Sequence, residues 1–447
     1  METSKDILNL AVNVQIKGNF QKAENLYNQI LDKEPDNINA LHLLGLVKYQ
    51  KNDSKEAIRL IQKAIELNPK IAVFYGNLGM VYDKLGLEEE SIKSFEKAIE
   101  IDCNYPNSYT AYYNLGISFM NKREFEKSLK YFDKTIELNK DFFDAYWNRG
   151  LALLALGRFQ EGFRDYEYRF KKKSPTDSRV FNKPQWDGSC LKGKRILILS
   201  EQGFGDNIQF ARYIPLIKEK GVYVLLECKK ELIKLFEQLG INEFVKKQNV
   251  PNLKFDYYIH LMSLPRLFNT SLENIPKNTP YLKADKELIE KFKKEINCDS
   301  FKIGIAWQGN PEQENNKNRS ASFENFKRLK EISGIKLFSL QKGVDFEKLN
   351  DFGVVDLSDK INDFADAAAV IENMDLIISV DTSVAHLAGA IGKPCWTLLC
   401  FNSDWRWLFN RKDCPWYSSM KLFRQKKQGD WDGVFEEVER ELKNFIT

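Results

Sequence analysis

Two short polar turns, each between an apolar run and a helix-like segment, hold the residue types best suited to chemistry. The segment Met374–Trp396 reads MDLIISVDTSVAHLAGAIGKPCW, with Asp381, Thr382 and Ser383 directly after a β-branched run. Such a run predicts a buried strand, and each of the three polar residues can cap the helix that should follow. Free N–H groups and the helix dipole at such a turn attract anions. We interpret this turn as a cradle for a diphosphate-bearing ligand.

The other turn lies earlier in the chain and reads SEQGFGDNIQFARYIPLI. Gly203 and Gly205 allow the backbone to approach a substrate closely, and Asp206 stands at the start of the predicted helix. Gln209 stands where a dinucleotide fingerprint needs Gly or Ala nearby, which argues against a nicotinamide cofactor. We assign Gly203, Gly205 and Gln209 to a loop that approaches the substrate. The residues alone leave Asp206 with two roles, a chemically active carboxylate or a simple helix cap.

Further polar residues stand after neighbouring strands. Arg319 ends the run WQGNPEQENNKNR, where its guanidinium either clamps a phosphate or remains a solvated loop charge. Gln341 and Lys342 close the next strand and can reach a base, a ribose or a phosphate. The run Asp430-Trp431-Asp432 matches a metal-binding DxD motif only superficially, because it opens the last helix and is better explained by capping.

Aromatic residues and histidines outside these turns are interpreted as structural. Trp405 and Trp407, in the run DWRW, are expected to pack rather than to stack on a ligand. His42 and His260 have no partner motif.

Alternating strands and helices must position the two turns. The first α/β half predicts strands at 195–200, 222–228, 243–246 and 256–260, with helices at 206–220 and 230–239. The second half predicts strands at 302–307, 336–340, 354–356, 375–380 and 395–399, with helices at 322–332, 364–373, 383–391 and 431–445. This alternation predicts parallel sheets with right-handed crossovers. Ligands of such sheets gather at the carboxyl ends of the strands.

The first part of the chain is a repeat. Gly45, Gly79, Gly116 and Gly150 are spaced by 34, 37 and 34 residues. A small residue recurs in the second helix of each unit, at Ala23, Ala57, Ser91, Ser128 and Gly162, and a large one four positions later, at Tyr27, Ile61, Phe95, Phe132 and Tyr166. The pattern resembles the tetratricopeptide repeat. We predict five stacked helical hairpins, near 4–37, 38–71, 72–105, 109–142 and 143–172, whose groove suits a protein or peptide partner.

The composition of the chain bears on nucleic-acid binding, cellular location and membrane association. The 447 residues include 67 basic and 63 acidic side chains, so no strong basic field favours nucleic acid. Seven scattered cysteines without a CxxC pair indicate reduced thiols and a cytoplasmic location. The start of the chain does not resemble a signal peptide. No apolar run reaches the roughly 18 residues of a transmembrane segment, which leaves only peripheral membrane contact open.

The two turns also carry a family resemblance. The runs GDNIQFARYIPLI and SVDTSVAHLAGAIGKP resemble the heptosyltransferase-type (family 9) glycosyltransferases. The runs EQGFGDNIQFARY, IAWQGNP, SLQKG, DTSVAHLAGA, DWRW and MKLFRQ…GDW are similar to those of bacterial proteins that join tetratricopeptide repeats to such a domain. The resemblance covers the whole chain.

The resemblance implies an α-solenoid followed by a GT-B pair of Rossmann-like α/β domains. It implies inverting, metal-independent transfer from a nucleotide-diphosphate sugar, the co-substrate, with no further cofactor. By the match, Asp206 corresponds to the catalytic base and Asp381 would hold the hydroxyls of the donor sugar. Thr382 and Ser383 would bind the diphosphate, Arg319 would contact a phosphate, and His386 would support the donor site or fix the turn. Ser383 replaces the motif's glycine, which argues against a seven-carbon sugar donor.

The predicted domains are a solenoid at 1–172, a linker at 173–192, an acceptor domain at 193–280 and a nucleotide-sugar domain at 281–447. The leading hypothesis is a glycosyltransferase whose repeats recruit a protein or peptide acceptor. The alternatives are a non-catalytic scaffold with a degenerate GT-B domain, and a nucleotide-sugar epimerase of the same shape.

Overall fold

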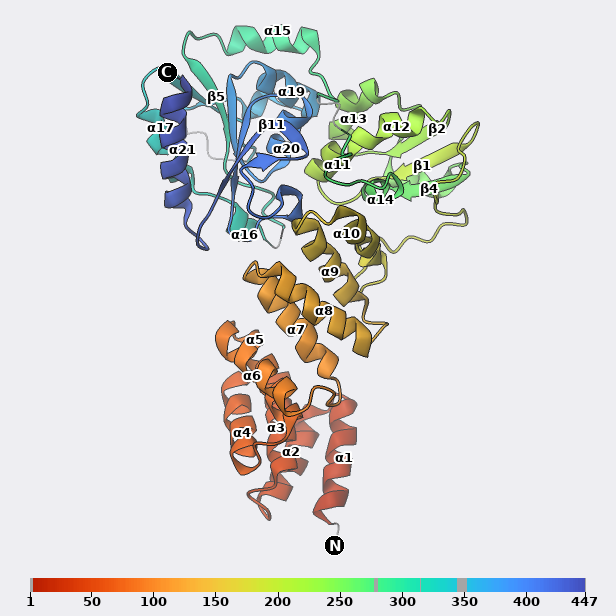
Figure 1. The fold of residues 1–447 in the computed structure, drawn as a ribbon, viewed down its shortest axis with the longest axis vertical. Coiled ribbons are helices and arrows are strands. Elements are labelled where there is room, and N and C mark those ends of the chain that lie inside the picture. The colour runs from red at the N-terminus through yellow and green to blue at the C-terminus, as the bar shows by residue number, and fades with distance from the viewer. Residues whose placement is uncertain (1–2, 277–279, 314, 344–351, 447) are drawn as a thin grey trace. The chain divides into compact units, whose positions relative to one another are not determined.

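The computed structural model describes residues 3–276, 280–313, 315–343 and 352–446 (Figure 1). The chain divides into two compact units, Met1–Ala152 and Leu153–Thr447. The division falls inside helix α9, Phe143–Ala155. The predicted domain boundaries after residues 172, 192 and 280 remain predictions.

The first unit is a series of antiparallel helical hairpins, in agreement with the predicted repeats (Figure 1). Its helices are α1 Ser4–Ile16, α2 Phe20–Leu31, α3 Ile38–Gln50, α4 Ser54–Leu67, α5 Ala72–Lys84, α6 Glu88–Ile101, α7 Ser108–Asn121 and α8 Phe125–Leu138, followed by α9. Each hairpin packs on the next, so that α2 contacts α3, α4 contacts α5 and α6 contacts α7.

The recurring glycine and the recurring large residue are in contact in three of the hairpins. A Cβ added at Gly45 would lie 2.7 Å from Ile61 Cγ1, one at Gly79 would lie 2.8 Å from the Phe95 ring, and one at Gly116 would lie 2.5 Å from the Phe132 ring. A side chain at these glycines would therefore push the two helices apart. His42 bonds to Asn77, and its ring lies 4.5 Å from that of Phe74, in agreement with its structural interpretation.

The second unit begins with helix α10, Phe159–Tyr166, and the 3₁₀ helix η1, Glu167–Phe170. The N-lobe follows, built on a parallel sheet with strand order β3-β2-β1-β4. Its strands are β1 Arg195–Leu199, β2 Tyr223–Glu227, β3 Glu243–Val245 and β4 Tyr257–His260. Its helices are α11 Phe204–Phe210, α12 Ile214–Lys218, α13 Lys230–Phe236 and α14 Leu264–Leu267, with 3₁₀ turns η2 Ala211–Tyr213, η3 Glu237–Leu239, η4 Lys247–Asn252 and η5 Leu261–Ser263.

The C-lobe is built on a larger sheet with strand order β10-β11-β9-β8-β5-β6-β7, parallel except for the β10/β11 pair. Its strands are β5 Phe301–Ala306, β6 Ile335–Ser339, β7 Val355–Asp356, β8 Leu376–Val380, β9 Cys395–Leu399, β10 Asp413–Cys414 and β11 Tyr417–Arg424. Its helices are α15 Lys286–Glu295, α16 Asn316–Arg319, α17 Phe323–Lys330, α19 Phe364–Glu372, α20 Ser383–Ala390 and α21 Trp431–Ile446, with 3₁₀ turns η6 Ser358–Lys360 and η7 Trp405–Trp407. The two parallel sheets form the predicted GT-B pair of Rossmann-like domains.

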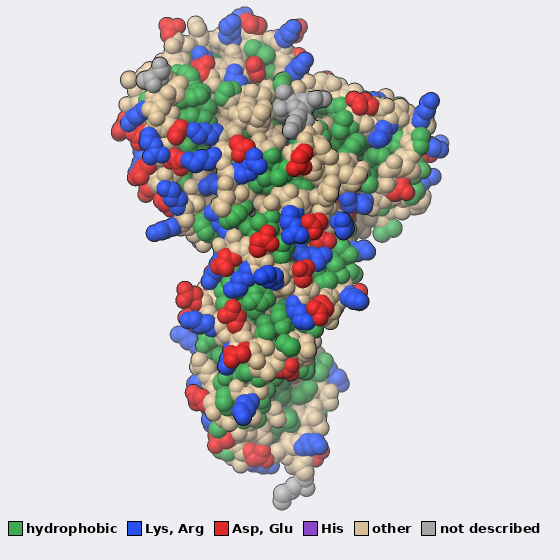
Figure 2. All heavy atoms as spheres, viewed as in Figure 1, with side chains coloured by type: hydrophobic (Ala, Val, Ile, Leu, Met, Phe, Trp, Pro, Cys, Tyr) green, Lys and Arg blue, Asp and Glu red, His purple; other side chains and the backbone are tan. Residues whose placement is uncertain are grey.

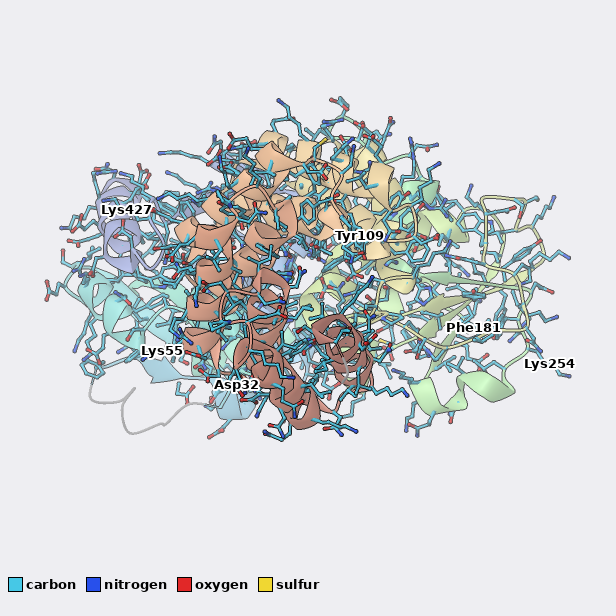
Figure 3. The ribbon with its side chains drawn as sticks, turned by 90° about the horizontal axis from the view of Figure 1, so that it is seen from below. Asp32, Lys55, Tyr109, Phe181, Lys254 and Lys427 are labelled. Atoms are coloured by element: carbon cyan, nitrogen blue, oxygen red, sulfur yellow. The ribbon has the colours of Figure 1, made fainter. Side chains whose placement is uncertain are left out.

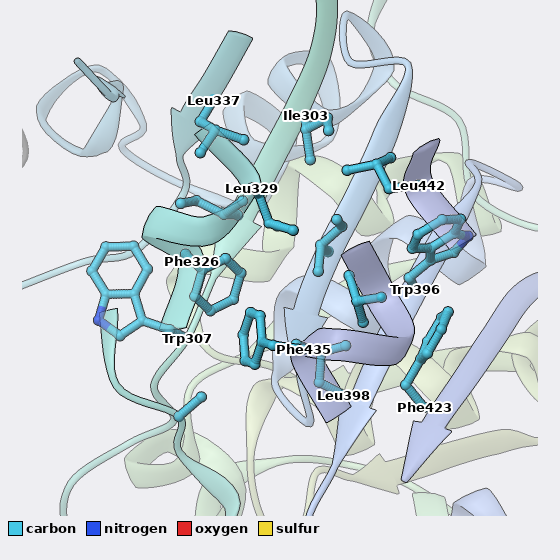
Figure 4. Close-up of a cluster of buried hydrophobic side chains, with 14 of the residues drawn as sticks. Ile303, Trp307, Phe326, Leu329, Leu337, Trp396, Leu398, Phe423, Phe435 and Leu442 are labelled. Carbon is cyan, nitrogen blue, oxygen red and sulfur yellow. The ribbon is translucent and has the colours of Figure 1, made fainter. Parts of the chain in front are cut away.

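Apolar packing holds the helices of the C-lobe on its sheet. Phe326 of α17 and Phe435 of α21 are fully buried and meet with ring centroids 4.8 Å apart (Figure 4). Asp430 caps α21 through the N–H of Gly433 at 2.9 Å, as predicted for the DxD-like run.

The N-lobe and C-lobe are in direct contact. Helix α11 packs on α20, and a Cβ at Gly205 would lie 2.7 Å from Cδ2 of His386. The hydroxyl of Tyr281 donates to the carbonyl of Ile208 at 2.8 Å, and Arg212 donates to the carbonyl of Trp416 at 2.8 Å. The carboxyl ends of β1 and β8 therefore face one space.

Two differences between the structure and the sequence prediction concern elements close to the contact of the two lobes. The helix predicted at 206–220 begins at Phe204 and is broken into α11, η2 and α12, with Pro215 in the first turn of α12. Strand β11 was not predicted, because Tyr417–Arg424 mixes polar residues with apolar ones at no strict period.

The surface carries acidic and basic side chains interspersed over the visible face (Figure 2), which agrees with the near balance of 67 basic and 63 acidic residues. Exposed side chains such as Asp32, Lys55 and Lys427 project outward from the ribbon (Figure 3). No helix in the described ranges is long and apolar enough to cross a membrane.

Candidate active site

A cavity of about 290 Å³ lies between the N-lobe and the C-lobe. The N-lobe lines it with the residues that follow β1, namely Gln202, Gly203, Phe204, Gly205 and Asp206, and with Lys229. The C-lobe lines it with Gly309, Asn310, Gln313, Arg319, Asp381, Thr382, Ser383, His386, Asp404 and Arg406. Both polar turns singled out from the sequence therefore contribute to one cavity.

The C-lobe turn is a helix N-terminus that faces the cavity. Thr382 is the N-cap of α20, because its hydroxyl accepts the N–H of Val384 at 3.3 Å. The hydroxyl of Ser379, inside β8, lies 3.0 Å from that of Thr382 and steadies the turn. Asp381 and Ser383 flank the cap, so side-chain oxygens and the first N–H groups of α20 surround the same point.

The N-lobe turn places a carboxylate at the third position of α11. Asp206 Oδ2 accepts the N–H of Gly203 at 2.8 Å, so the side chain reaches back to the start of its own helix. This is the contact expected of a capping role. The other oxygen, Oδ1, bonds to Nη2 of Arg406 from the C-lobe. Asp206 therefore combines a local contact with one that crosses the cavity.

Arg406 joins carboxylates of both lobes. Its side chain is 6% exposed, and besides Asp206 it contacts Asp404 through Nη1 at 2.6 Å. Burial raises the pKa of Asp206 above the ordinary aspartate value, Arg406 and the Gly203 N–H lower it, and Asp404 raises it. Burial alone would lower the pKa of Arg406, but the two carboxylates raise it, so the guanidinium is always charged.

The environment of Asp381 disfavours the ionised carboxylate more than that of Asp206 does. Burial, followed by the negative charge of Asp404, raises the pKa of Asp381 to about 6. Nε2 of His386 lies 4.0 Å from its Oδ1. Asp381 therefore titrates close to neutral pH.

His386 is buried and neutral. Burial, followed by the charges of Arg406, Arg212 and Arg319, lowers its pKa well below the ordinary value. Nδ1 lies 3.0 Å from the hydroxyl of Tyr417, and the ring stacks on Trp407 at 5.0 Å. Because burial raises the pKa of Tyr417 well above its ordinary value, the phenol keeps its proton and can donate it to Nδ1. Nε2 would then carry the ring proton toward Asp381.

Arg319 supplies a guanidinium on the C-lobe side of the cavity. A Cβ at Gly309 would lie 2.3 Å from its Nη2, so only glycine allows the guanidinium to lie against this backbone. Its Nε is buried and has no hydrogen-bond partner among the described residues. A buried donor without a partner is suited to an anionic ligand in the cavity.

Three predicted site residues do not line this cavity. Gln209 is fully buried within α11, and its amide finds no partner in the described part of the chain. Gln341 Oε1 accepts the N–H groups of Trp307 and Gln308 at 3.2 and 2.9 Å. Lys342 donates to the carbonyl of Ile361 and lines a neighbouring cavity of about 310 Å³.

The neighbouring cavity is mostly apolar. Its apolar lining consists of Phe204, Leu340, Ile361, Phe364, Ala367, Ile371 and Val384. Phe204 and Ser383 line both cavities, so the polar and the apolar space meet beside the N-terminus of α20.

The sequence reasoning did not identify Arg406, Asp404 or Lys229 as site residues. Lys229 faces the cavity from the N-lobe, its Nζ 4.6 Å from the Phe204 ring centre. An arginine that is buried between two tryptophans, as in the run DWRW, needs a charged partner. That run could therefore have pointed to Arg406 as a site residue. Trp405 packs on Phe163 at 5.6 Å, and Trp407 on His386, in agreement with their predicted packing role.

The described residues contain no cluster of three or more His, Cys, Asp or Glu side chains that could hold a metal ion. His260 contacts Asp177 at 3.2 Å and lies outside the cavity, as expected for a structural histidine.

Fold and site define a class, namely tetratricopeptide repeats followed by a GT-B pair with a helix N-terminus at the cavity between its lobes. Family profiles agree with this class. Residues 16–78, 72–105 and 113–178 match tetratricopeptide repeats, and residues 346–428 match glycosyltransferase family 9 (heptosyltransferase). The chain thus carries N-terminal tetratricopeptide repeats and a C-terminal family 9 domain. The family 9 match includes Asp381, His386 and Arg406, whereas Asp206 lies outside it.

Individual proteins are similar over different extents. The chain is 26% identical to Protein FlbA of Caulobacter vibrioides over 444 residues, which cover 92% of this chain and 74% of FlbA. It is 36% identical to the mitochondrial import receptor subunit TOM70 of Rattus norvegicus over 83 residues, 18% of this chain and 14% of TOM70. The crystal structure of MamA protein aligns with a TM-score of 0.33 and 25% identity, covering 38% of this chain and 91% of MamA.

Proposed function

We propose that the protein is an inverting glycosyltransferase that moves a sugar from a nucleotide-diphosphate donor to a hydroxyl group of an acceptor, without a metal ion. The single observation that carries the proposal is the shared cavity. It brings the Asp206 carboxylate of one lobe opposite the helix N-terminus at Thr382 of the other. This pairs a proton acceptor with a site for a departing diphosphate.

The donor would occupy the two adjoining cavities. Its diphosphate would lie at the N-terminus of α20, with Ser383 on one side and Arg319 supplying positive charge. Its base would fill the apolar cavity beside Phe204, because a planar aromatic ring is best accommodated among apolar side chains. Asp381 would accept hydrogen bonds from the hydroxyls of the sugar.

In the reaction, Asp206 would take the proton of the acceptor hydroxyl while the oxygen of that hydroxyl forms a bond to the anomeric carbon of the donor sugar. The bond from that carbon to the diphosphate oxygen breaks on the opposite face, and the nucleoside diphosphate leaves with the electron pair. Arg319, Lys229 and the N–H groups of α20 would stabilise the charge that develops on the diphosphate. Attack from the face opposite the leaving group inverts the anomeric carbon.

The repeats would recruit a protein or peptide that presents the acceptor hydroxyl. This role is supported by the stacked hairpins of the first unit, because solenoids of this kind form extended binding surfaces. The proposed location is the cytoplasm.

The test measures donor turnover. The full chain is incubated with a panel of nucleotide-diphosphate sugars, and nucleoside diphosphate release is followed with and without candidate acceptor proteins. Release above the spontaneous rate, lost in Asp206→Asn but kept in Asp432→Asn, would support the proposal. Asp432 is a suitable control because it forms an exposed ion pair with Arg328 away from the cavity. No release and no thermal stabilisation by any panel member would refute the proposal.

A second function follows from a different reading of Asp206, since both of its oxygens already have partners, Gly203 and Arg406. In a non-catalytic scaffold that carboxylate would serve only to join the lobes. The scaffold predicts that Asp206→Asn lowers the melting temperature without changing any biological activity of the chain. A transferase predicts loss of turnover with donor affinity retained.

A further inference from the structure

The helical segment before the N-lobe contains an arginine with no access to solvent. Arg169, in η1, is 0% exposed and contacts Glu201, directly after β1, through Nε at 2.9 Å and Nη2 at 3.0 Å. It also donates to Glu167 Oε1 and to Ser263 Oγ, both at 2.7 Å. Burial alone would lower the pKa of Arg169, but the two carboxylates raise it. The bidentate pair with Glu201 fixes the point at which the Asp206 turn begins.

The next residue of that turn is held by the same segment. Gln202 has a φ of 55°, a left-handed conformation that is uncommon for a residue with a side chain. Its Nε2 donates to the hydroxyl of Tyr166, at the end of α10, at 2.8 Å. Gln202 lines the cavity, four residues before Asp206. A left-handed residue keeps its conformation only where its surroundings impose it, and Tyr166 supplies one such contact.

The segment also contacts the turn that carries Arg406. Trp405 lies against Phe163 with ring centroids 5.6 Å apart and against Tyr166 at 6.1 Å. Phe159 stacks on Trp416, which precedes β11, at 5.4 Å. One helical segment, α10 with η1, therefore contacts the chain next to both members of the Asp206–Arg406 pair.

From these contacts we infer that α10 and η1, the end of the repeat region, are a positioning element of the active site. Arg169 and Tyr166 act as positioning residues that set the Glu201–Asp206 turn against Arg406. Stability alone does not require a buried ionic network, because apolar residues of similar volume stabilise a fold as well or better. The network instead fixes one geometry of the turn. This inference rests on the proposed transferase function, since it concerns the geometry of the same site.

The test replaces the fully buried Arg169–Glu201 pair as a whole. In Arg169→Met/Glu201→Leu both members become apolar, and Glu167, whose side chain is 20% exposed, keeps Arg266 at 3.7 Å, so folding should be preserved. We expect kcat to fall about 10- to 100-fold, because small misplacements of catalytic groups have effects of this size. The donor KM and the Kd for the nucleoside diphosphate should change less than about twofold, since Arg319 and the N–H groups of α20 lie on the C-lobe and Lys229 is outside the Arg169 network. The acid limb of the pH–kcat/KM profile should also move, because Asp206 and Arg406 would no longer meet in the same geometry.

A milder variant keeps the inference testable if the double variant does not fold. Tyr166→Phe removes only the hydroxyl that accepts from Gln202, and kcat should fall about threefold to tenfold with donor KM unchanged. The kcat of Tyr166→Phe/Gln202→Leu should be no lower than that of Gln202→Leu alone, because both substitutions remove the same hydrogen bond. Glu161→Ala, which removes an exposed partner of Arg158 on the same helix, is the matched control and should leave kcat unchanged.

The outcomes separate this inference from the proposed function. A wild-type chain that turns over no donor overturns both. If the wild type is active and kcat of Arg169→Met/Glu201→Leu stays within about twofold of it, only the positioning role is overturned. If that double variant does not fold, the same holds for kcat of Tyr166→Phe. A fall in kcat at constant donor KM, absent in Glu161→Ala, supports it.

Discussion

The two lobes contain the same local device and use it differently. Each has a parallel strand, a polar turn with an aspartate and a short helix, β1 with Asp206 and α11 in one lobe, β8 with Asp381 and α20 in the other. Burial raises the pKa of both carboxyls, but the next largest influence has opposite signs. For Asp206 it is the cation of Arg406, and for Asp381 it is the anion Asp404.

This difference shows that a turn geometry does not define a chemical role. Asp206 is paired before any ligand arrives, which favours its ionised form and fixes its direction. Among the described residues, no cation is in direct contact with Asp381, which would gain from the hydroxyl donors of a sugar. The first arrangement suits a base, and the second suits a binding residue. Four substitutions test this comparison.

The largest effect is expected for Asp206→Asn. An amide cannot accept the acceptor's proton, so kcat should fall about 10²- to 10⁴-fold. Isothermal titration with the nucleoside diphosphate should give a Kd close to that of the wild type, because Asp206 is on the lobe opposite Arg319 and α20. If Asp381→Asn lowered kcat as much at saturating donor, the assigned division between base and binding residue would be wrong.

Arg406→Met should have the next largest effect. The variant leaves the carboxylate of Asp206, whose side chain is only 15% exposed, without its cation. Unfolding by urea should therefore show a loss on the order of 3 kcal/mol, to which the exposed Asp404 adds little. The pKa of Asp206 should rise further. Because the base works ionised, activity should then be lost at a higher pH on the acid side than in the wild type.

Arg411→Met is the control for Arg406, since Arg411 forms an exposed pair with Asp413 in the same region. It should leave both stability and the pH profile unchanged. An unshifted acid limb in Arg406→Met would show that Asp206 does not determine that limb.

Gly205→Ala tests the contact of the two devices. The new methyl group would lie 2.7 Å from Cδ2 of His386, so the lobes must separate or the imidazole must move. A destabilisation of about 1–3 kcal/mol is expected, together with a lower kcat/KM. Adding His386→Ala should make the effect of Gly205→Ala smaller, since the atom it meets is gone. Additive effects in this pair would contradict a direct contact.

The smallest of the four effects is the change in stability expected for Asp381→Asn. The folded pKa of about 6 lies above the ordinary value of 3.8, so the folded state holds the proton more tightly than the unfolded chain. Wild-type stability therefore falls as the pH rises from 3.8 to about 6 and stays reduced above that range. The Asn variant lacks this loss, and its melting temperature should exceed that of the wild type by a few degrees at pH 7.5 and match it near pH 4. Equal melting temperatures at pH 7.5 would show that Asp381 is not destabilised.

Much of the fold could be predicted because its determinants are local in sequence. Gly79 and Phe95 recur at fixed spacing, and the structure brings them into contact. The run Leu376–Val380 followed by Thr382 contains both a buried strand and the cap of its helix. Patterns of this kind depend on residues that are neighbours along the chain, so one sequence reveals them.

The parts that could not be predicted depend on distant residues. Arg406 meets Asp206 across 200 positions, and Arg169 meets Ser263 across 94, so no local pattern pairs them. Gln209 was placed in the substrate loop by its spacing, but α11 turns its side chain into the interior. Strand β11 is fixed by its pairing with β9 rather than by its own residues.

The ion pair between Asp206 and Arg406 has a consequence for the growing or partly folded chain. Its acid belongs to the N-lobe and its cation to the C-lobe, 200 positions apart in sequence. A chain that ends before the C-lobe lacks Arg406, and a fragment with only the C-lobe lacks Asp206. Under the proposed function, wasteful hydrolysis of activated sugar is thereby withheld until synthesis has passed residue 406 and both halves have docked.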